Sequence, residues 1–210
     1  MGLISAGTTI FDAGSVNAGG AMTFIKKITA SSSSTISFVH GSSSVVFDGT
    51  YKEYLFTFNN LHPAANACDF MFQVSTNGGS SYGVSMTSCY TQLYHREDGN
   101  SGQVAHRTGA LNALGNSTGF QSMSTADGIG DDNDQCGSGH MRFFNPASTT
   151  FVKNWMIDFT HYTNDNASMR NLVAGYVNTT SAVNAIRFKM NNGSSDQNTD
   201  SGDICLYGIS

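Results

Sequence analysis

The chain has 210 residues, of which 39% are hydrophobic, 11% aromatic and only 12% charged, with a formal net charge of −5. Two glutamates and five lysines are too few for the surface of a helical bundle, and the charge is too low for a disordered tail. We therefore expect an all-β globular protein whose surface is rich in Ser, Thr, Asn and Gly.

The charge pattern also bears on the partners of the protein. Its ten basic residues are scattered along the chain, whereas a nucleic-acid-binding protein needs a basic face to neutralise phosphates. An apolar run of roughly 18–20 residues, the length that spans a bilayer, does not occur. We expect neither nucleic-acid binding nor membrane insertion.

Residues 1–21 are rich in glycine and carry a few isolated apolar residues. Ordering such a segment costs much conformational entropy, so it needs a surface to dock on. We predict an extended N-terminal arm that anchors the protein to a neighbouring subunit. Its anchoring side chains would be Leu3, Ile4, Ile10 and Phe11.

From Thr23 onward the hydrophobic pattern has a period of two, which is typical of half-buried β-strands. Turn sequences such as Asn77-Gly-Gly and Asn192-Gly separate the strands, and the one helical candidate, at 103–114, is interrupted by Gly109. The pattern predicts one domain at 22–210, an antiparallel β-sandwich with jelly-roll character. The predicted strands lie near 23–28, 36–39, 45–47, 54–59, 69–74, 82–94, 141–144, 151–162, 172–177, 183–190 and 204–209.

Three tyrosines share one face of the predicted strand at 82–94. Tyr82, Tyr90 and Tyr94 all stand at even positions, so their side chains would point the same way. An exposed tyrosine row can stack on sugar rings or on a receptor protein. The same spacing fits a face that is half-buried in the sandwich, and periodicity favours this second interpretation.

The most acidic segment runs from Gly128 to Gly139 and contains Asp131, Asp132 and Asp134. Carboxylates on a glycine-rich loop are ligands suited to Ca²⁺, but the spacing of an EF-hand is absent. We favour a solvated turn and keep calcium as the alternative. No other cofactor is expected.

The charged segment His95–Asp98, with His62 or His161, contains the residue types of an acid–base pair. However, the sequence has no recognised catalytic motif, and nothing links Glu53 with Glu97 as glycoside hydrolysis would require. We expect a protein that is not an enzyme, and a hydrolase ranks last among the alternatives.

The four cysteines are far apart and form no C-x-x-C pair, which excludes a zinc knuckle or a redox motif of that type. Cys68, Cys89 and Cys205 lie in strand-like runs, where a reduced cysteine usually serves as a small buried apolar residue. We expect reduced thiols throughout.

Several blocks of the sequence resemble a family of short structural proteins encoded by marine tailed bacteriophages, including phages of cyanobacteria. The resemblance extends from about Phe24 to the C-terminus. The blocks that carry it are Lys26–Phe38, Tyr51–Ala64, Ser75–Val84, Phe143–Lys153, Ala174–Val183 and Leu206–Ile209.

This resemblance implies a component of the virion that assembles with other virion proteins and forms a homo-oligomer, with a trimer favoured by analogy. The main hypothesis is a tail fibre or tail-associated adaptor held by its arm, with the turns Asn77–Ser81 and Gly128–Gly139 at the far end facing solvent or a host surface glycan. The alternatives are a capsid decoration protein and a carbohydrate-binding β-sandwich module.

Overall fold

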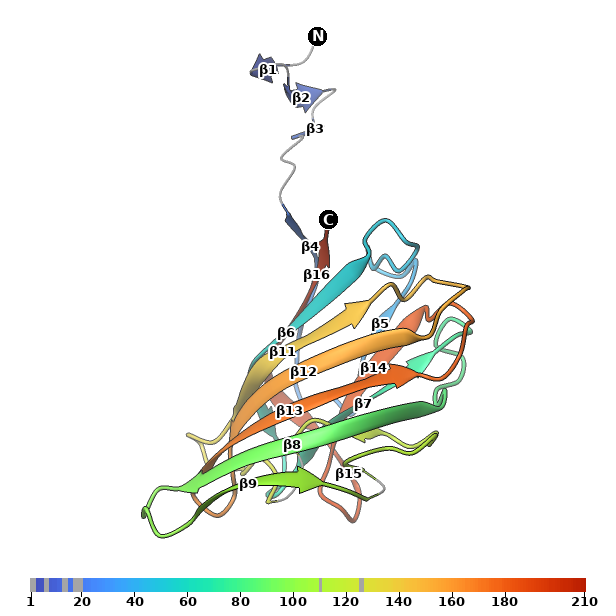
Figure 1. Cartoon of the computed structure of the whole chain (residues 1–210). Helices are drawn as coiled ribbons and strands as arrows, with labels where there is room; N and C mark the ends of the chain where they lie inside the picture. The colour runs from blue at the N-terminus through green and yellow to red at the C-terminus, as the bar shows by residue number, and fades with distance from the viewer. Residues whose placement is uncertain (1–2, 6–7, 13–14, 17–20, 110, 125–126) are drawn as a thin grey trace.

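A computed structural model describes the backbone of residues 3–5, 8–12 and 15–16, and residues 21–109, 111–124 and 127–210 with their side chains (Figure 1). Every regular element in this part of the chain is a β-strand, so the all-β prediction is confirmed. None of the described residues belongs to a helix long and apolar enough to cross a membrane.

Eight of the 16 described strands belong to one antiparallel sheet, which we call the large sheet. Its inward and outward side chains alternate, and in β12 Trp155, Ile157 and Phe159 are buried while Asn154 and Met156 are exposed. In spatial order its strands are β4 (Met22–Thr29), β16 (Thr199–Ile209), β6 (Glu53–Pro63), β11 (Gly137–Phe144), β12 (Lys153–Tyr162), β13 (Ala167–Val177), β8 (Met86–Arg96) and β9 (Gly102–Arg107).

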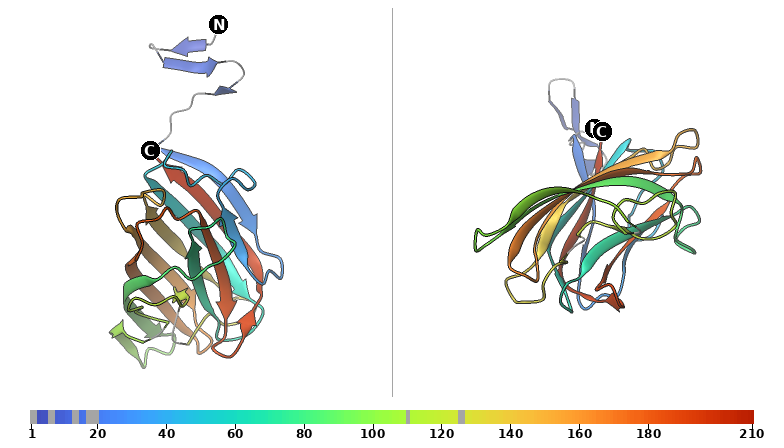
Figure 2. Two further views of the ribbon diagram at one scale, coloured as in Figure 1. Left: turned by 90° about the vertical axis from the view of Figure 1, so that its right-hand side faces the viewer. Right: turned by 60° about the horizontal axis from the view of Figure 1, so that its bottom comes forward.

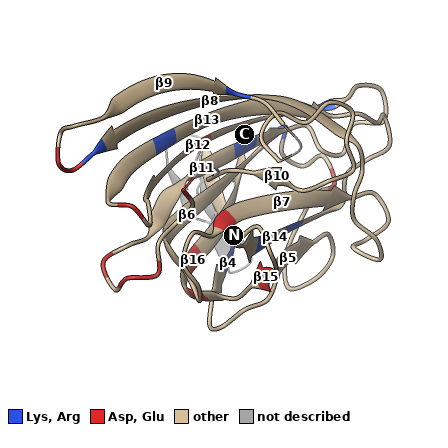
Figure 3. Cartoon of the chain, turned by 90° about the horizontal axis from the view of Figure 1, so that it is seen from below, with Lys and Arg blue, Asp and Glu red and all other residues tan. Residues whose placement is uncertain are grey.

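A second antiparallel sheet, the small sheet, faces the large one (Figure 3). Its central strand is β14, which pairs with β7 along one edge and with β5 and β15 along the other. Its strands are β10 (Gln121–Ser122), β7 (Asp69–Ser75), β14 (Ala185–Asn191), β15 (Asp196–Gln197) and β5 (Ile36–Val39).

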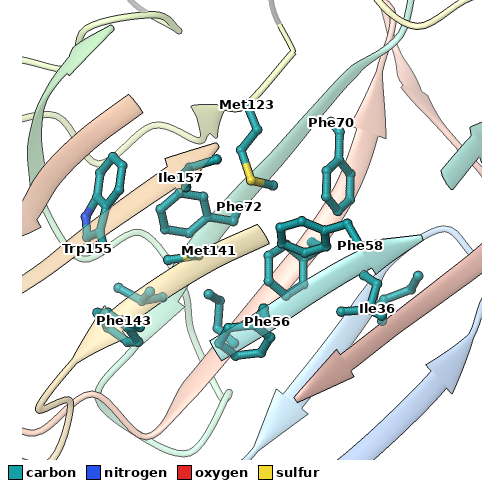
Figure 4. Close-up of a cluster of buried hydrophobic side chains, with 14 of the residues drawn as sticks. Ile36, Phe56, Phe58, Phe70, Phe72, Met123, Met141, Phe143, Trp155 and Ile157 are labelled. Atoms are coloured by element: carbon teal, nitrogen blue, oxygen red, sulfur yellow. The ribbon is translucent and has the colours of Figure 1, made fainter. Parts of the chain in front are cut away.

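Phenylalanines from both sheets fill the space between them (Figure 4). Phe188 of β14 stacks on Phe70 with ring centroids 5.6 Å apart, and it meets the edges of Phe56 and Phe58 from the large sheet. Each such aromatic pair contributes about 0.5–1.5 kcal/mol beyond the apolar area it buries. The two sheets therefore share one core in a sandwich-like arrangement.

The inner face of the large sheet also holds buried polar side chains. The Nδ1 atom of His161 lies 3.3 Å from Nδ2 of Asn171 on the next strand. Burial lowers the pKa of His161 to about 3, so its imidazole is neutral at neutral pH. Lys153 is buried too, and its ammonium group donates to the carbonyl oxygens of Phe151 and Thr179, both at 3.1 Å.

The described domain begins and finishes at the same end of the sandwich, which we call the terminal end. The N–H of Ser210 donates to the carbonyl oxygen of Ala21 at 3.1 Å, and β4 and β16 are neighbours there (Figure 2). The turn Asn77–Ser81 lies at this end as well, because Gly78 N–H donates to the Asn184 side chain beside the start of β14. The expectation that this turn lies far from the arm was wrong.

The opposite end, which we call the distal end, carries the loops 64–68, 97–101, 127–136 and 163–166. Together these loops contain seven of the 15 acidic residues of the sequence and none of its ten Lys and Arg residues. Figure 3, viewed from below, shows acidic positions at the tips of several loops as well as at β7 and β15. The segment from Gly128 to Gly139 lies at this end, as expected.

Among the described N-terminal residues, β2 (Thr8–Asp12) pairs antiparallel with β1 (Leu3–Ser5) and with β3 (Ser15–Val16). Their backbone register places Leu3 opposite Phe11. The side chains of the predicted anchors Leu3, Ile4, Ile10 and Phe11 lie outside the described part, so the anchoring arm stays a prediction.

One local prediction was wrong. Residues 45–47 form no strand, although Val45 and Phe47 are buried, because they pack on the core from a loop. The segment 103–114, where the helical pattern is interrupted by Gly109, begins as strand β9: Gly102–Arg107 pairs with β8 along the edge of the large sheet.

Candidate functional site

The outward face of the large sheet carries an unusual number of apolar side chains around a small residue. Strand register places Ala174 of β13 between Met156 of β12 and Cys89 of β8. Met156 is 55% exposed and Leu172 is 38% exposed, although both lie in the middle of the sheet. The short Ala174 side chain leaves a hollow between these longer neighbours.

Two hollows meet over Ala174 and form one continuous depression, which we call the outer groove. One has a volume of about 470 Å³ and the other of about 540 Å³. Both hollows are lined by Cys89, Phe144, Met156 and Ala174. The first hollow is also lined by Thr87, Asn154 and Tyr176. The second is also lined by Thr91, His140, Arg142, Asp158 and Leu172.

The charged groups at the groove are already paired with one another. Arg170 donates from Nε and Nη2 to the two carboxylate oxygens of Asp158, at 2.8 and 2.5 Å. These hydrogen bonds lower the pKa of Asp158. Arg142 lies 3.1 Å from the carboxylate of Glu53. Both arginines at the groove therefore have a carboxylate partner.

Several polar side chains at the groove are available for hydrogen bonding. Within the described residues, the side chains of Thr91, His140 and Asn154 have no hydrogen-bond partner. Phe144 and Tyr176 are half-buried aromatic residues on either side of Asn154 in the strand register. The groove thus combines aromatic walls, an apolar floor and side-chain donors and acceptors that have no partner within the described residues.

Glycine and tryptophan support the groove from behind. Gly175 follows Ala174, and a side chain at this position would face inward. A Cβ atom added there would lie 2.6 Å from the Trp155 indole and 2.4 Å from the carbonyl oxygen of Thr87. The indole packs edge-on against Phe72 of the small sheet at 5.2 Å. The segment that forms the groove floor is therefore held close to the core.

The predicted tyrosine row does not form an exposed surface, and this prediction was wrong for Tyr90, which is fully buried in the core. Tyr94 is half-buried, and its hydroxyl contacts Asp165 and Arg96. Tyr82 precedes β8, which begins at Met86. The even-numbered positions of β8 face the core, as the second interpretation of the spacing required.

Tyr82 has another environment, on the outer side of the small sheet. The guanidinium group of Arg187 lies 4.3 Å from the centroid of the Tyr82 ring and 5.1 Å from that of Phe120. The same guanidinium donates to Gln73 at 2.8 Å. This cation–π arrangement holds the loops that contain Tyr82 and Phe120 against the small sheet.

The acidic loop at the distal end is organised by a buried glutamine. The side chain of Gln135 accepts from the N–H of Asp132 at 3.3 Å and donates to the carbonyl oxygen of Thr163 at 3.2 Å. The described residues contain no group of three His, Cys, Asp or Glu side chains that could hold a metal ion. Asp131, Asp132 and Asp134 therefore offer no described calcium site.

Some of the residues considered for acid–base chemistry share one hollow. His95, Glu97 and His161 line a hollow of about 430 Å³ at the distal end. His161 reaches this hollow from the inner face of the large sheet, where it is buried. Glu53 lies elsewhere, at the terminal end beside Arg142, so the structure does not link it with Glu97.

The cysteines differ in their surroundings. All four are free thiols, and Cys68 and Cys205 are buried as predicted. Burial raises the pKa of Cys68 to about 11. The expectation that Cys89 is buried was wrong: it is exposed, because its position in β8 points into the outer groove.

Sequence reasoning missed the outer groove. Its signal was present as uninterrupted apolar runs, Trp155-Met156-Ile157 and Leu172-Val173-Ala174, in strands where one face alone should be apolar. Comparisons with protein-family models, with curated proteins and with solved structures find no match to this chain.

Proposed function

We propose that this chain is a non-enzymatic structural protein of a bacteriophage virion, a tail fibre or tail-associated adaptor. In this proposal residues 1–21 form the anchoring arm, the sandwich has jelly-roll character, and the subunits form a homo-oligomer. The observation that carries it is the position of both ends of the domain at the terminal end, where Ser210 pairs with Ala21.

This arrangement suits a subunit that is held at one end. The described domain begins at Ala21 at the terminal end, and the acidic loops lie at the distal end. An anchor and an outward-facing surface are thereby separated by the length of the strands. The sequence blocks that resemble phage structural proteins support the virion as the setting.

The test is incorporation into phage particles. We compare the full chain, a chain without residues 1–20, and a full-length variant with serine at Leu3, Ile4, Ile10 and Phe11. The deletion and the serine variant should fold normally and be missing from purified particles. The control Val104→Ser, at a side chain that is 72% exposed on β9, should be incorporated normally.

Incorporation of the serine variant at the level of the unmodified chain would contradict the anchoring role. Antibody labelling of intact particles then locates the protein. Label on the tail supports the fibre or adaptor, whereas label over the capsid surface would favour a decoration protein.

A further inference from the structure

From the chemistry of its lining we infer that the outer groove is a binding site for a neutral oligosaccharide. This inference concerns a surface of the domain itself and does not depend on the arm or on the place of the protein in a particle. It also differs from the predicted tyrosine row, because the groove lies on the outward face of β11, β12, β13 and β8.

The charges at the groove argue for an uncharged ligand. Arg170 is held by both oxygens of Asp158, and Arg142 is paired with Glu53. The two arginines and the two carboxylates balance one another, so the groove has no excess of either sign from these groups that would select an ionic ligand. A neutral ligand leaves both pairs intact.

The mixture of apolar and polar lining argues for a ligand with both kinds of surface. A purely apolar occupant would cover Thr91, His140 and Asn154 without giving their side chains hydrogen bonds, which is costly. Sugars carry hydroxyls around the ring and C–H groups on its faces. The hydroxyls match the free polar groups, and the C–H faces match Phe144 and Tyr176.

The shape of the groove argues against a second copy of this chain as the occupant. A two-fold contact through this face would place the hollow over Ala174 against the same hollow of the partner. Two facing concavities leave an unfilled space, whereas stable interfaces are closely packed. An open groove that crosses several strands instead suits an extended chain of sugar rings.

The position of Ala174 provides a direct test. Its side chain points outward, so Ala174→Phe fills the groove floor without entering the core. Ser168→Phe is the matched control, because Ser168 is exposed on the same strand and the same face, six residues away. A second variant, Tyr176→Ser, removes an aromatic wall without adding volume, and it serves if Ala174→Phe folds poorly.

The full-length protein is titrated separately with cellohexaose, maltohexaose, mannohexaose and chitohexaose, followed by amide chemical shifts in NMR. Titration to about 10 mM detects complexes with Kd on the order of 1 mM. We expect one of these sugars to shift the amides of Met156, Leu172 and Ala174. Ala174→Phe or Tyr176→Ser should weaken that binding at least about tenfold, and Ser168→Phe should leave it unchanged.

Three results would overturn the inference. The first is that none of the four sugars binds. The second is that a sugar binds but Ala174→Phe and Tyr176→Ser have no effect. The third is that sedimentation shows a dimer which Ala174→Phe dissociates, because the groove would then be covered by a second copy. Each result leaves the incorporation test of the virion role unaffected.

Discussion

Asp69 is the carboxyl group whose titration should most affect folding. It begins β7, opposite Asn191 of β14, and it follows Cys68, which is buried. Burial raises the pKa of Asp69 to about 7 from its ordinary value of 3.8. The replacement Asp69→Asn keeps the shape of the side chain and removes its ionisation.

The sign and size of the effect follow from linkage. Well below the unfolded pKa of 3.8 the carboxyl is protonated in both the folded and the unfolded protein, so it contributes no pH dependence there. Between pH 4 and pH 7 the unfolded chain releases the proton and the folded protein retains it, so stability falls as the pH rises. The folded and unfolded pKa values of Asp69 differ by about three, which lowers the free energy of unfolding by roughly 4 kcal/mol at pH 8.

Urea unfolding of the unmodified protein and of Asp69→Asn at pH 4 and pH 8 measures this effect. At each pH we take the free energy of unfolding of the variant minus that of the unmodified protein. This difference should be about 4 kcal/mol larger at pH 8 than at pH 4. Asp203→Asn is the control of opposite sign, because hydrogen bonds from Thr29 and Lys27 lower the pKa of Asp203. It should lose stability at pH 8. An Asp69→Asn difference that is equal at both pH values would refute the reasoning.

Other predictions concern the core and the thiols. Because the folded pKa of His161 is depressed to about 3, the protein should lose stability as the pH falls below about 6.5, and His161→Gln should reduce this loss in acid unfolding curves. Gly175→Ala should lower the free energy of unfolding by about 1–3 kcal/mol and change the fluorescence of the one tryptophan. Gly115→Ala, with open space around it, should leave the free energy of unfolding unchanged. With a thiol reagent, Cys89 should react in the native protein and Cys68 after unfolding; rapid reaction of Cys68 would contradict its burial.

The period-two pattern was sufficient to predict the fold class and most strand positions. Alternation at Trp155, Ile157 and Phe159, for example, follows from the pleat of a strand with one face in the core. The pattern could not separate Val45 and Phe47 from strand residues, because a loop that packs on the core buries apolar side chains in the same way.

The candidate site depended on tertiary structure. The sequence determined that Tyr90 shares a face with its even-numbered neighbours, but strand pairing decided that this face is the core. Likewise, Cys89, Met156 and Ala174 are far apart in sequence, and the register of β8, β12 and β13 alone places them side by side. Local periodicity records which residues share a face, whereas long-range pairing selects the partner strands and the face that remains open to solvent.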